Sequence, residues 1–442
     1  MDTDCFSLYV GIDWGDAQHQ VCMLSDPNHP KELQVKHGGR ALADLAMALA
    51  HDVWGQNHRV AVAIEVDSGP VVESLLLQGF AVYSINPRQL DRLRDRYFPS
   101  GAKDDRRDAL VLAQSLRTDR QLFKRVEADD PDTITLRHVT RARDELQRSL
   151  QRTTNRLRNH LAQYFPALLQ LSPDASDPLV WALIERAPDP EAAAKLSIVT
   201  IAKIVKDLRI RRVSPQQIRD VLREPPVQLL PGARQALAQR ALTLIPQIRL
   251  FHEQFVEHTR AMERQIADRC QPVQEPVSEP AGEPALEAPA PDQSSKPSDA
   301  PTSPAPRLSD AAILRSMVGI GAYVLAVLLT EATRAIARRD LAALRAQTGI
   351  APVTRQSGHS LHVSMRRACS WRLQKAAYCW GMAAIQNDPL SKAHYQRLRA
   401  SGHTHARALR GVVDRLLDVL ITMLRDGTLY HPERRRELHN AA

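Results

Sequence analysis

The hydrophobic and polar positions of the first 125 residues alternate between a strand period and a helix period. Short apolar runs bounded by turn residues predict five strands, at 6–15, 19–26, 31–38, 59–66 and 81–87. Amphipathic stretches predict helices at 40–53 and from 71 to Gly79, and two further helical stretches follow the last strand. Three strands followed by alternating helices and strands predict an α/β domain with a mixed sheet.

This order of elements matches the ribonuclease-H-like (RuvC-like) arrangement, and we assign it to residues 1–128. From about Thr133 to Phe165, and again from about Ala233 to Arg269, apolar residues recur at near 3.5-residue spacing. Two such helices suit a coiled-coil hairpin or a dimerisation arm. Packing of each stripe on its own domain is an equally good interpretation. We assign residues 129–270 to this helical region.

Residues 271–307 differ in composition from the rest of the chain. They hold ten of the 29 prolines with Ala, Glu and Ser, which predicts an extended, disordered linker. A mainly helical C-terminal domain is predicted at 308–442. In it, LRSMVGIGAYVLAVLLTEA predicts a helix-hairpin-helix-like turn at Gly319–Gly321, which could present backbone N–H groups to a phosphate or be an ordinary turn between helices.

The charge of the chain favours a polyanionic partner. Its net charge is +9, and because residues 272–307 carry −4, the remainder carries +13. The five cysteines show no zinc-finger spacing. Their odd count in a long chain argues against a disulfide framework and favours a reducing cytosol. With no signal peptide or membrane-length apolar run apparent, we expect a cytoplasmic protein without a membrane partner.

Four acidic residues carry most of the chemical information: Asp13 in YVGIDWG, Glu65 in VAIEVDS, and Asp105 and Asp108 in AKDDRRDA. The first two end apolar strands, and the other two share one face at the start of a helix. Taken singly, each acid is commonly a turn or helix-cap residue. Asp67 and Asp104 lie close enough in sequence to be alternative members of the set.

Together the four carboxylates predict a divalent-metal centre. Oxygen-only ligands favour Mg²⁺, the metal of phosphodiester chemistry, and two Mg²⁺ ions about 4 Å apart could activate the attacking oxygen and stabilise the leaving one. Lys103, Arg106 and Arg107 nearby would contact phosphates.

The basic loop TGIAPVTRQSGHS holds a candidate nucleophile, Ser357, before Gly358 and after Arg355. Most Ser-Gly pairs are only turns. His359 and His362 are candidate acid–base groups, and Ser360 and Ser364 are alternative hydroxyls.

Taken together, GIDWG, AKDDRRDALVLAQSLR, the Arg-rich helix HVTRARDELQRSLQRTTNRLRNHL and TGIAPVTRQSGHS resemble the IS110-type transposases over nearly the whole chain. The resemblance implies that Asp13, Glu65, Asp105 and Asp108 hold Mg²⁺ and that Ser357 forms a transient phosphoserine link to DNA. It also implies a structured noncoding guide RNA and a homo-oligomer, a dimer or tetramer. Asp104 departs from the family, where Thr is more usual, and the Pro-rich insertion is longer than is typical.

Two other functions remain open at this stage. A RuvC-like Holliday-junction or structure-specific nuclease would use water and need the four acids but not Ser357. A non-catalytic nucleic-acid-binding protein would need neither, and the intact acidic set argues against it.

Overall fold

The computed structural model describes residues 5–26, 28–98, 104–230, 232–271, 308–358 and 360–433. The chain divides into two compact units, Met1–Asp130 and Pro131–Ala442, and each is described by itself. The predicted linker at 271–307 lies, except for its first residue, outside the described residues. In the part of the chain that is described, no helix combines the length and apolar character needed to cross a membrane.

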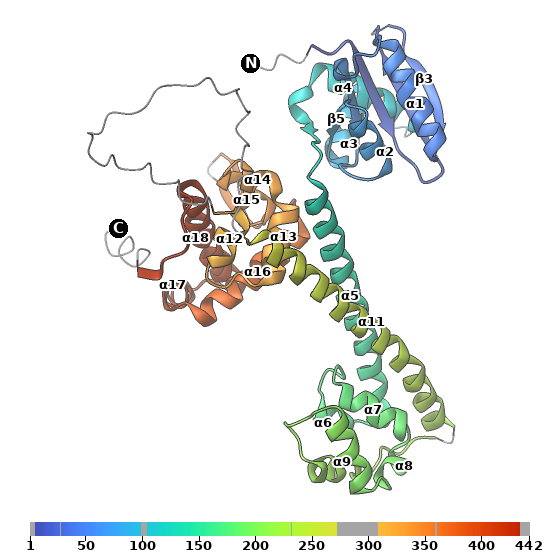
Figure 1. Cartoon of the computed structure of the whole chain (residues 1–442), viewed down its shortest axis with the longest axis vertical. Coiled ribbons are helices and arrows are strands. Elements are labelled where there is room, and N and C mark those ends of the chain that lie inside the picture. Colours follow the sequence, from blue (N-terminus) through green and yellow to red (C-terminus); the bar gives the residue numbers. More distant parts are fainter. Residues whose placement is uncertain are drawn as a thin grey trace, which may run out of the picture. The chain divides into compact units, whose positions relative to one another are not determined.

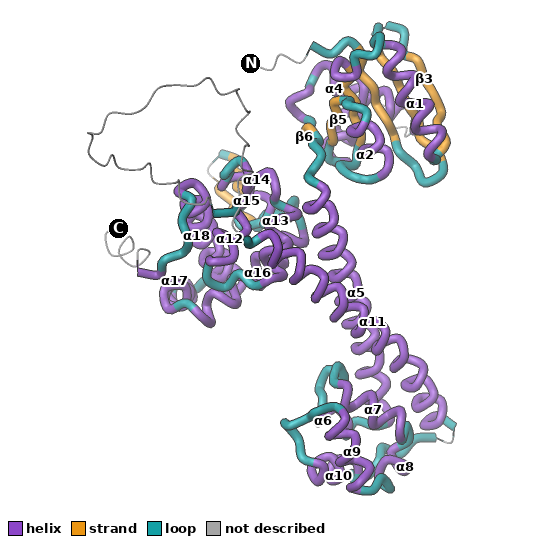
Figure 2. The backbone as a smooth tube through the Cα atoms, viewed as in Figure 1, coloured by secondary structure: helices purple, strands orange, loops and turns teal. Residues whose placement is uncertain are grey.

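The first unit is built on one six-stranded mixed sheet, which confirms the predicted α/β class (Figure 2). Its strands, in the order in which they pair, are β3 (Lys31–Lys36), β2 (Gln18–Leu24), β1 (Leu8–Asp13), β4 (Val60–Ile64), β5 (Ala81–Ser84) and β6 (Lys124–Arg125). The three central strands β1, β4 and β5 are parallel, and the outer pairings are antiparallel. Every residue of β4 is buried, as expected for a strand covered on both faces.

Helices cover both faces of this sheet (Figure 1). Their bounds are α1 (Gly39–Asp52), α2 (Pro70–Leu77), α3 (Pro87–Tyr97) and α4 (Asp105–Thr118), with 3₁₀ turns at Asn57–Arg59 and Arg120–Leu122. Helices α1 and α2 pack on the face that presents Val10, Ile12 and Val62. Helices α3 and α4 pack on the other face, against Ala61 and Ala63. The small side chains on that second face let α4 approach the sheet closely.

In the second unit two long helices, α5 (Pro131–Tyr164) and α11 (Ala233–Arg269), lie side by side and antiparallel (Figure 1). Two contacts fix their direction: Arg269 Nη1 donates to Thr133 Oγ1 at 3.0 Å, and Arg143 Nε donates to Thr259 Oγ1 at 3.2 Å. The described structure does not test whether they form a regular coiled coil, so that part stays a prediction.

The apolar stripes of α5 and α11 pack into two separate cores. At one end, Leu157 and Leu161 pack with Ile245 and Ile248 and with five short helices that connect the long ones. These are α6 (Leu168–Leu171), α7 (Pro178–Arg186), α8 (Pro190–Ala194), α9 (Ile198–Asp207) and α10 (Pro215–Leu222). Side-chain caps such as Ser214, whose hydroxyl accepts from Gln217 N, explain where the later helices begin.

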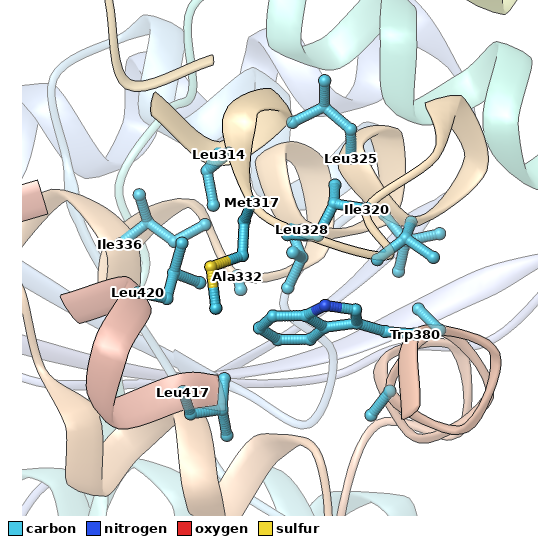
Figure 3. Packing of buried hydrophobic residues seen from close by; sticks show 14 of the residues in the cluster. Leu314, Met317, Ile320, Leu325, Leu328, Ala332, Ile336, Trp380, Leu417 and Leu420 are labelled. Atoms are coloured by element: carbon cyan, nitrogen blue, oxygen red, sulfur yellow. The ribbon is translucent and has the colours of Figure 1, made fainter. Parts of the chain in front are cut away.

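At the other end, α5 and α11 contribute Leu136, Met262 and Ile266 to the core of the C-terminal segment. Its helices are α12 (Asp310–Ser316), α13 (Ala322–Glu331), α14 (Thr333–Ala337), α15 (Leu341–Gln347), α16 (Trp371–Asn387), α17 (Pro389–Ala400) and α18 (His405–Asp426). Figure 3 shows Trp380 in this core, surrounded by side chains of α12, α13 and α18. A two-stranded hairpin, β7 (Val353–Ser357) and β8 (Ser360–Ser364), precedes α16.

The turn between α12 and α13 packs against α16. Trp380 Nε1 donates to the Val318 carbonyl at 2.8 Å, and Gly319, at φ +80°, lies so close that a Cβ there would be 3.0 Å from Ala384 N. Glycine is therefore required at Gly319 by both conformation and space. A phosphate-binding role for this turn stays a prediction.

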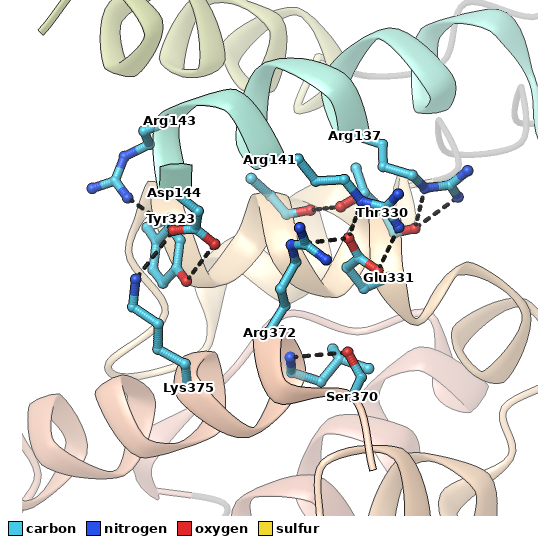
Figure 4. A network of polar contacts seen from close by, with 12 residues as sticks. Arg137, Arg141, Arg143, Asp144, Tyr323, Thr330, Glu331, Ser370, Arg372 and Lys375 are labelled. Atoms are coloured by element: carbon cyan, nitrogen blue, oxygen red, sulfur yellow. Dashed lines mark hydrogen bonds and ion pairs between the residues drawn. The ribbon is translucent and has the colours of Figure 1, made fainter. Parts of the chain in front are cut away.

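A polar network joins α5 to α13 and α16 (Figure 4). Asp144 of α5 is completely buried and accepts hydrogen bonds from Tyr323 at 3.3 Å and from Lys375 Nζ at 3.1 Å. Burial, together with the charge of Asp144, raises the pKa of Tyr323, which keeps its hydroxyl protonated as a donor. Arg141 binds Glu331 through two hydrogen bonds of 2.8 and 3.1 Å. The helical region and the C-terminal segment thus share one folded unit.

Candidate active site

The ends of two neighbouring parallel strands bring Asp13 and Glu65 together. Ile12 of β1 pairs with Ile64 of β4, so the next residue of each strand emerges at the same edge of the sheet. Neighbouring strands lie about 4.8 Å apart, which places the two acids side by side. Asp67 carries an exposed carboxylate 4.0 Å from Lys124 Nζ on β6 and is directed toward that strand. This geometry favours Glu65 over Asp67 as the partner of Asp13.

A close approach of α4 to β1 brings the other two acids to the same edge. A Cβ built on Gly11 would lie 2.0 Å from the Ala109 carbonyl oxygen and 2.6 Å from Ala113 N, so the backbones touch where only glycine fits. At the far end of the helix, the Arg120 guanidinium stacks on Phe6, which precedes β1. Helix α4 therefore runs antiparallel to β1, and its first turn lies toward Asp13.

The three acids at the start of α4 have different environments. Asp104 is exposed and is the N-cap, its side chain accepting from Arg106 N at 3.3 Å. Asp105 is the first helical residue and is exposed. Asp108 is only 2% exposed. Capping thus accounts structurally for Asp104, whereas Asp105 and Asp108 are left for other roles.

Asp108 forms a buried ion pair that the sequence analysis did not identify. Arg94 of α3 donates from Nε to Oδ1 of Asp108 and from Nη2 to Oδ2 at 2.8 Å. The hydrogen bonds to Asp108 raise the pKa of the Arg94 guanidinium. One signal was present in the sequence, because Arg94 continues the apolar face of α3 four residues after the buried Leu90.

A buried histidine holds the chain directly after Asp13. Gly15 N donates to His19 Nδ1 at 3.2 Å, which leaves the ring proton on Nε2, 3.0 Å from His37 Nδ1. Burial, and then the neighbouring His37, lowers the pKa of His19. Protonation at Nδ1 would place two donors face to face and break the bond to Gly15.

This pairing predicts a loss of stability in acid. Because the folded state favours neutral His19, its contribution is complete above the unfolded pKa of about 6.5 and is lost as the pH falls below that value. We expect the melting temperature to fall between pH 7.5 and pH 5.5, and to fall less in His19→Asn, whose amide oxygen takes the position of Nδ1 and can accept from Gly15. His58→Asn, at an exposed position, is the control and should melt like the parent. An equal acid shift in both variants would contradict the assignment.

Ser357 lies in a strand rather than in the predicted loop. It is the last residue of β7, pairs with Ser360 across the turn, and is exposed. Arg355 lies two residues before Ser357 and so shares its face of the hairpin. His362 pairs with Arg355 directly across the strands and lies on the same face. The other face carries the exposed Leu361 and Val363. His359 lies outside the described residues.

Comparison with known proteins identifies the relatives of this chain. Residues 10–166 match the family model of the DEDD transposases of IS110 type, and residues 311–396 match that of the transposase IS116/IS110/IS902 family. The IS110 insertion-element 43.6 kDa protein of Streptomyces coelicolor is 31% identical over 97% of this chain and 96% of its own length. The chain belongs to the IS110 family of transposases.

Two further relatives support the family assignment. The mini-circle putative transposase for IS117 of S. coelicolor is 29% identical over 94% of both chains. The putative transposase y4uE of Sinorhizobium fredii is 44% identical over 215 residues, which are 48% of this chain and 59% of that protein. The resemblance inferred from the sequence motifs is thereby confirmed.

An IS110-family transposase acts on DNA, and its DEDD domain implies a nuclease-like site that depends on a divalent metal. The donors at the sheet edge fit such an ion, because they are carboxylates, the ligands that hard cations prefer. Among the residues that the structure describes, however, no group of three or more His, Cys, Asp or Glu side chains is close enough to hold a metal. The described acids therefore lie at one edge of the sheet, but their side chains are not close enough together to form a complete set of metal ligands.

Mutation can distinguish the roles of the two adjacent acids at the start of α4, Asp104 and Asp105. Asp104→Ala should remove the helix cap, costing about 1 kcal/mol of stability, and leave most DNA cleavage intact. Asp105→Ala should leave stability nearly unchanged and lower cleavage on the order of 10²-fold, the loss expected for a metal ligand. Cleavage of labelled DNA and thermal melting of both variants provide the measurement. The reverse pattern would assign the metal to Asp104.

Proposed function

We propose that this transposase cuts and rejoins DNA with Ser357 as nucleophile, assisted by Mg²⁺ that Asp13, Glu65, Asp105 and Asp108 hold. The observation that carries the proposal is the presence in one chain of the acidic sheet edge and of an exposed serine beside Arg355. An enzyme that used water alone would need the first and not the second. The two features lie in separate units of the chain.

The chemistry at Ser357 is an exchange of phosphodiester bonds. Its Oγ attacks phosphorus and forms an O–P bond, the bond from phosphorus to one DNA oxygen breaks, and the serine proton leaves to a base as the DNA hydroxyl gains one. Attack by a hydroxyl of the second DNA strand then releases serine and restores a phosphodiester. Arg355 supplies charge to the phosphate, and His362, opposite it, is the candidate proton acceptor.

The bound Mg²⁺ would stabilise charge on the phosphate oxygens. Asp13 and Glu65 would hold it from the strand ends, and Asp105 and Asp108 from α4. Each acid lies in or directly after a helix or strand, so metal binding would order side chains rather than backbone.

In this proposal a structured noncoding RNA from the insertion sequence selects the DNA. The active form is a homo-oligomer, a dimer or tetramer. The support is family membership and the net charge of +9. A basic chain gathers phosphate-rich partners, while sequence choice requires base recognition, which base pairing to a guide would supply.

One experiment tests the proposal. The protein is incubated with Mg²⁺, end-labelled DNA and a transcript of the element's flanking RNA, and denaturing gels are examined for a covalent protein–DNA adduct. We expect an adduct that requires both RNA and metal. Cleaved DNA with free ends and no adduct would indicate hydrolysis by a RuvC-like nuclease, and neither product would indicate a binding protein. Cleavage that does not need RNA would remove the guide from the proposal.

A further inference from the structure

Three nitrogen atoms of Arg94 donate hydrogen bonds to aspartates, one of which is the proposed metal ligand Asp108. Its Nε and Nη2 bind the two oxygens of Asp108, and Nη1 donates to Asp91 at 2.9 Å. The Arg94 side chain is 10% exposed and that of Asp108 2% exposed, so water screens the pair little. Arginine fits this place because its planar fork matches both carboxylate oxygens at once.

Among the four acids proposed to bind metal, Asp108 is buried and already bound to a cation, Arg94. An ionised carboxylate buried without a partner would be strongly unfavourable, and Arg94 removes that penalty before any metal is present. A divalent cation that bound Asp108 would have to coordinate oxygens that already accept hydrogen bonds from Arg94. The positive charge of Arg94 would also repel it. Arg94 and the metal therefore act on the same carboxylate.

We propose that Arg94 is a positioning residue that serves as a resident cation of the acidic site, ordering Asp108 before the metal arrives and competing with the metal for its oxygens. The inference rests on the proposed function, in which these acids hold Mg²⁺. Competition makes the metal weakly held by the protein alone. Phosphate oxygens of bound DNA then complete the coordination, as is usual for Mg²⁺, so that the site is loaded when its substrate is present.

The test measures metal binding without nucleic acid. Mn²⁺ binding to the full-length protein is followed by electron paramagnetic resonance for the parent, Arg94→Met and Arg94→Lys. Competition predicts that Arg94→Met binds Mn²⁺ about tenfold more tightly, with Arg94→Lys between it and the parent, because the effects of two cations on one site are reciprocal. Equal or weaker binding by Arg94→Met would overturn the inference.

Arg96→Met is the matched control. Arg96 lies one half-turn further along α3 and also pairs with an aspartate, Asp119 at 3.0 Å, but its side chain is 60% exposed. Its removal should leave Mn²⁺ affinity unchanged. A gain equal to that of Arg94→Met would indicate a general effect of net charge and would also overturn the inference.

Two further measurements keep the outcome decisive. Arg94→Met leaves Asp108 buried and unpaired, so its melting temperature should be low without metal and should rise more on Mn²⁺ addition than that of the parent. If this variant does not fold, Arg94→Lys decides, and unchanged Mn²⁺ affinity there overturns the inference. Asp13→Asn, made in the Arg94→Met background where binding should be tightest, separates the two proposals. If Arg94→Met binds no more Mn²⁺ than the double variant, the metal site itself is refuted, whereas binding that Asp13 supports but Arg94 does not influence refutes only the inference.

Discussion

Ser357→Ala is expected to lower formation of the covalent protein–DNA adduct by at least roughly 10³-fold, because no other atom at that position can form the ester to phosphorus. The side chain is exposed at the end of β7. Its removal should therefore change the free energy of unfolding by no more than about 0.5 kcal/mol. Denaturing gels measure the adduct, and melting of the same samples shows that the loss is chemical.

The hairpin itself offers the control for this variant. Ser360 pairs directly with Ser357, lies on the same face and is also exposed. Ser360→Ala should keep adduct formation close to that of the parent. If Ser360→Ala lost the adduct and Ser357→Ala kept it, the nucleophile would be Ser360, and if both kept it, Ser364 would be the next hydroxyl to change.

Gly11→Ala is expected to give the largest loss of stability in the first unit, about 3 kcal/mol. The added methyl would lie 2.0 Å from the Ala109 carbonyl oxygen and 2.9 Å from Leu112 Cβ. Because the first of these is backbone, the clash can be relieved only by moving α4 away from β1. Asp105 and Asp108 would move with the helix, and DNA cleavage would fall as well.

Urea unfolding measures the loss, and hydrogen exchange of peptides from β1 and α4 locates it. Gly39→Ala is the control, since Gly39 begins α1 and a Cβ there would have no atom within 4 Å. That change should be neutral or stabilise by about 0.5 kcal/mol through the lower entropy of the unfolded chain. Unchanged exchange in α4 of Gly11→Ala would contradict the close β1–α4 contact.

The sequence was sufficient to predict five of the six strands, because these carry local apolar patterns, whereas the two-residue strand β6 (Lys124–Arg125) is too short to show one and was missed. The metal-binding role of the acids at the strand ends stays a prediction. Buried apolar runs end at Asp13 and just before Glu65, and the parallel pairing of β1 with β4 makes neighbours of those ends. The start of α4 was predictable from its acids for the same reason. These features follow from periodicity and from the order of elements.

Contacts between elements could not be predicted in the same way. The pairing of Arg94 with Asp108 joins two helices, and nothing in either helix alone specifies the partner. The hairpin around Ser357 was taken for a loop because β7 is mainly polar and exposed, although Leu361 and Val363 alternate with polar residues in β8, a strand signal that the prediction missed. The single spacing pattern along α5 gave no sign that its two ends enter different cores.

The burial of Asp144 of α5 between Tyr323 and Lys375 limits where this chain can be joined to a relative in a chimera. A chimera joined within 272–307 would take α5 from one parent and α13 and α16 from another. A chimera that kept Asp144 but lost Lys375 would leave a buried charge without its cationic partner, at a cost of about 3–5 kcal/mol. A junction near Asp130 keeps the network within one parent. The boundary at which segments can be exchanged is therefore the start of α5, far upstream of the point where composition changes.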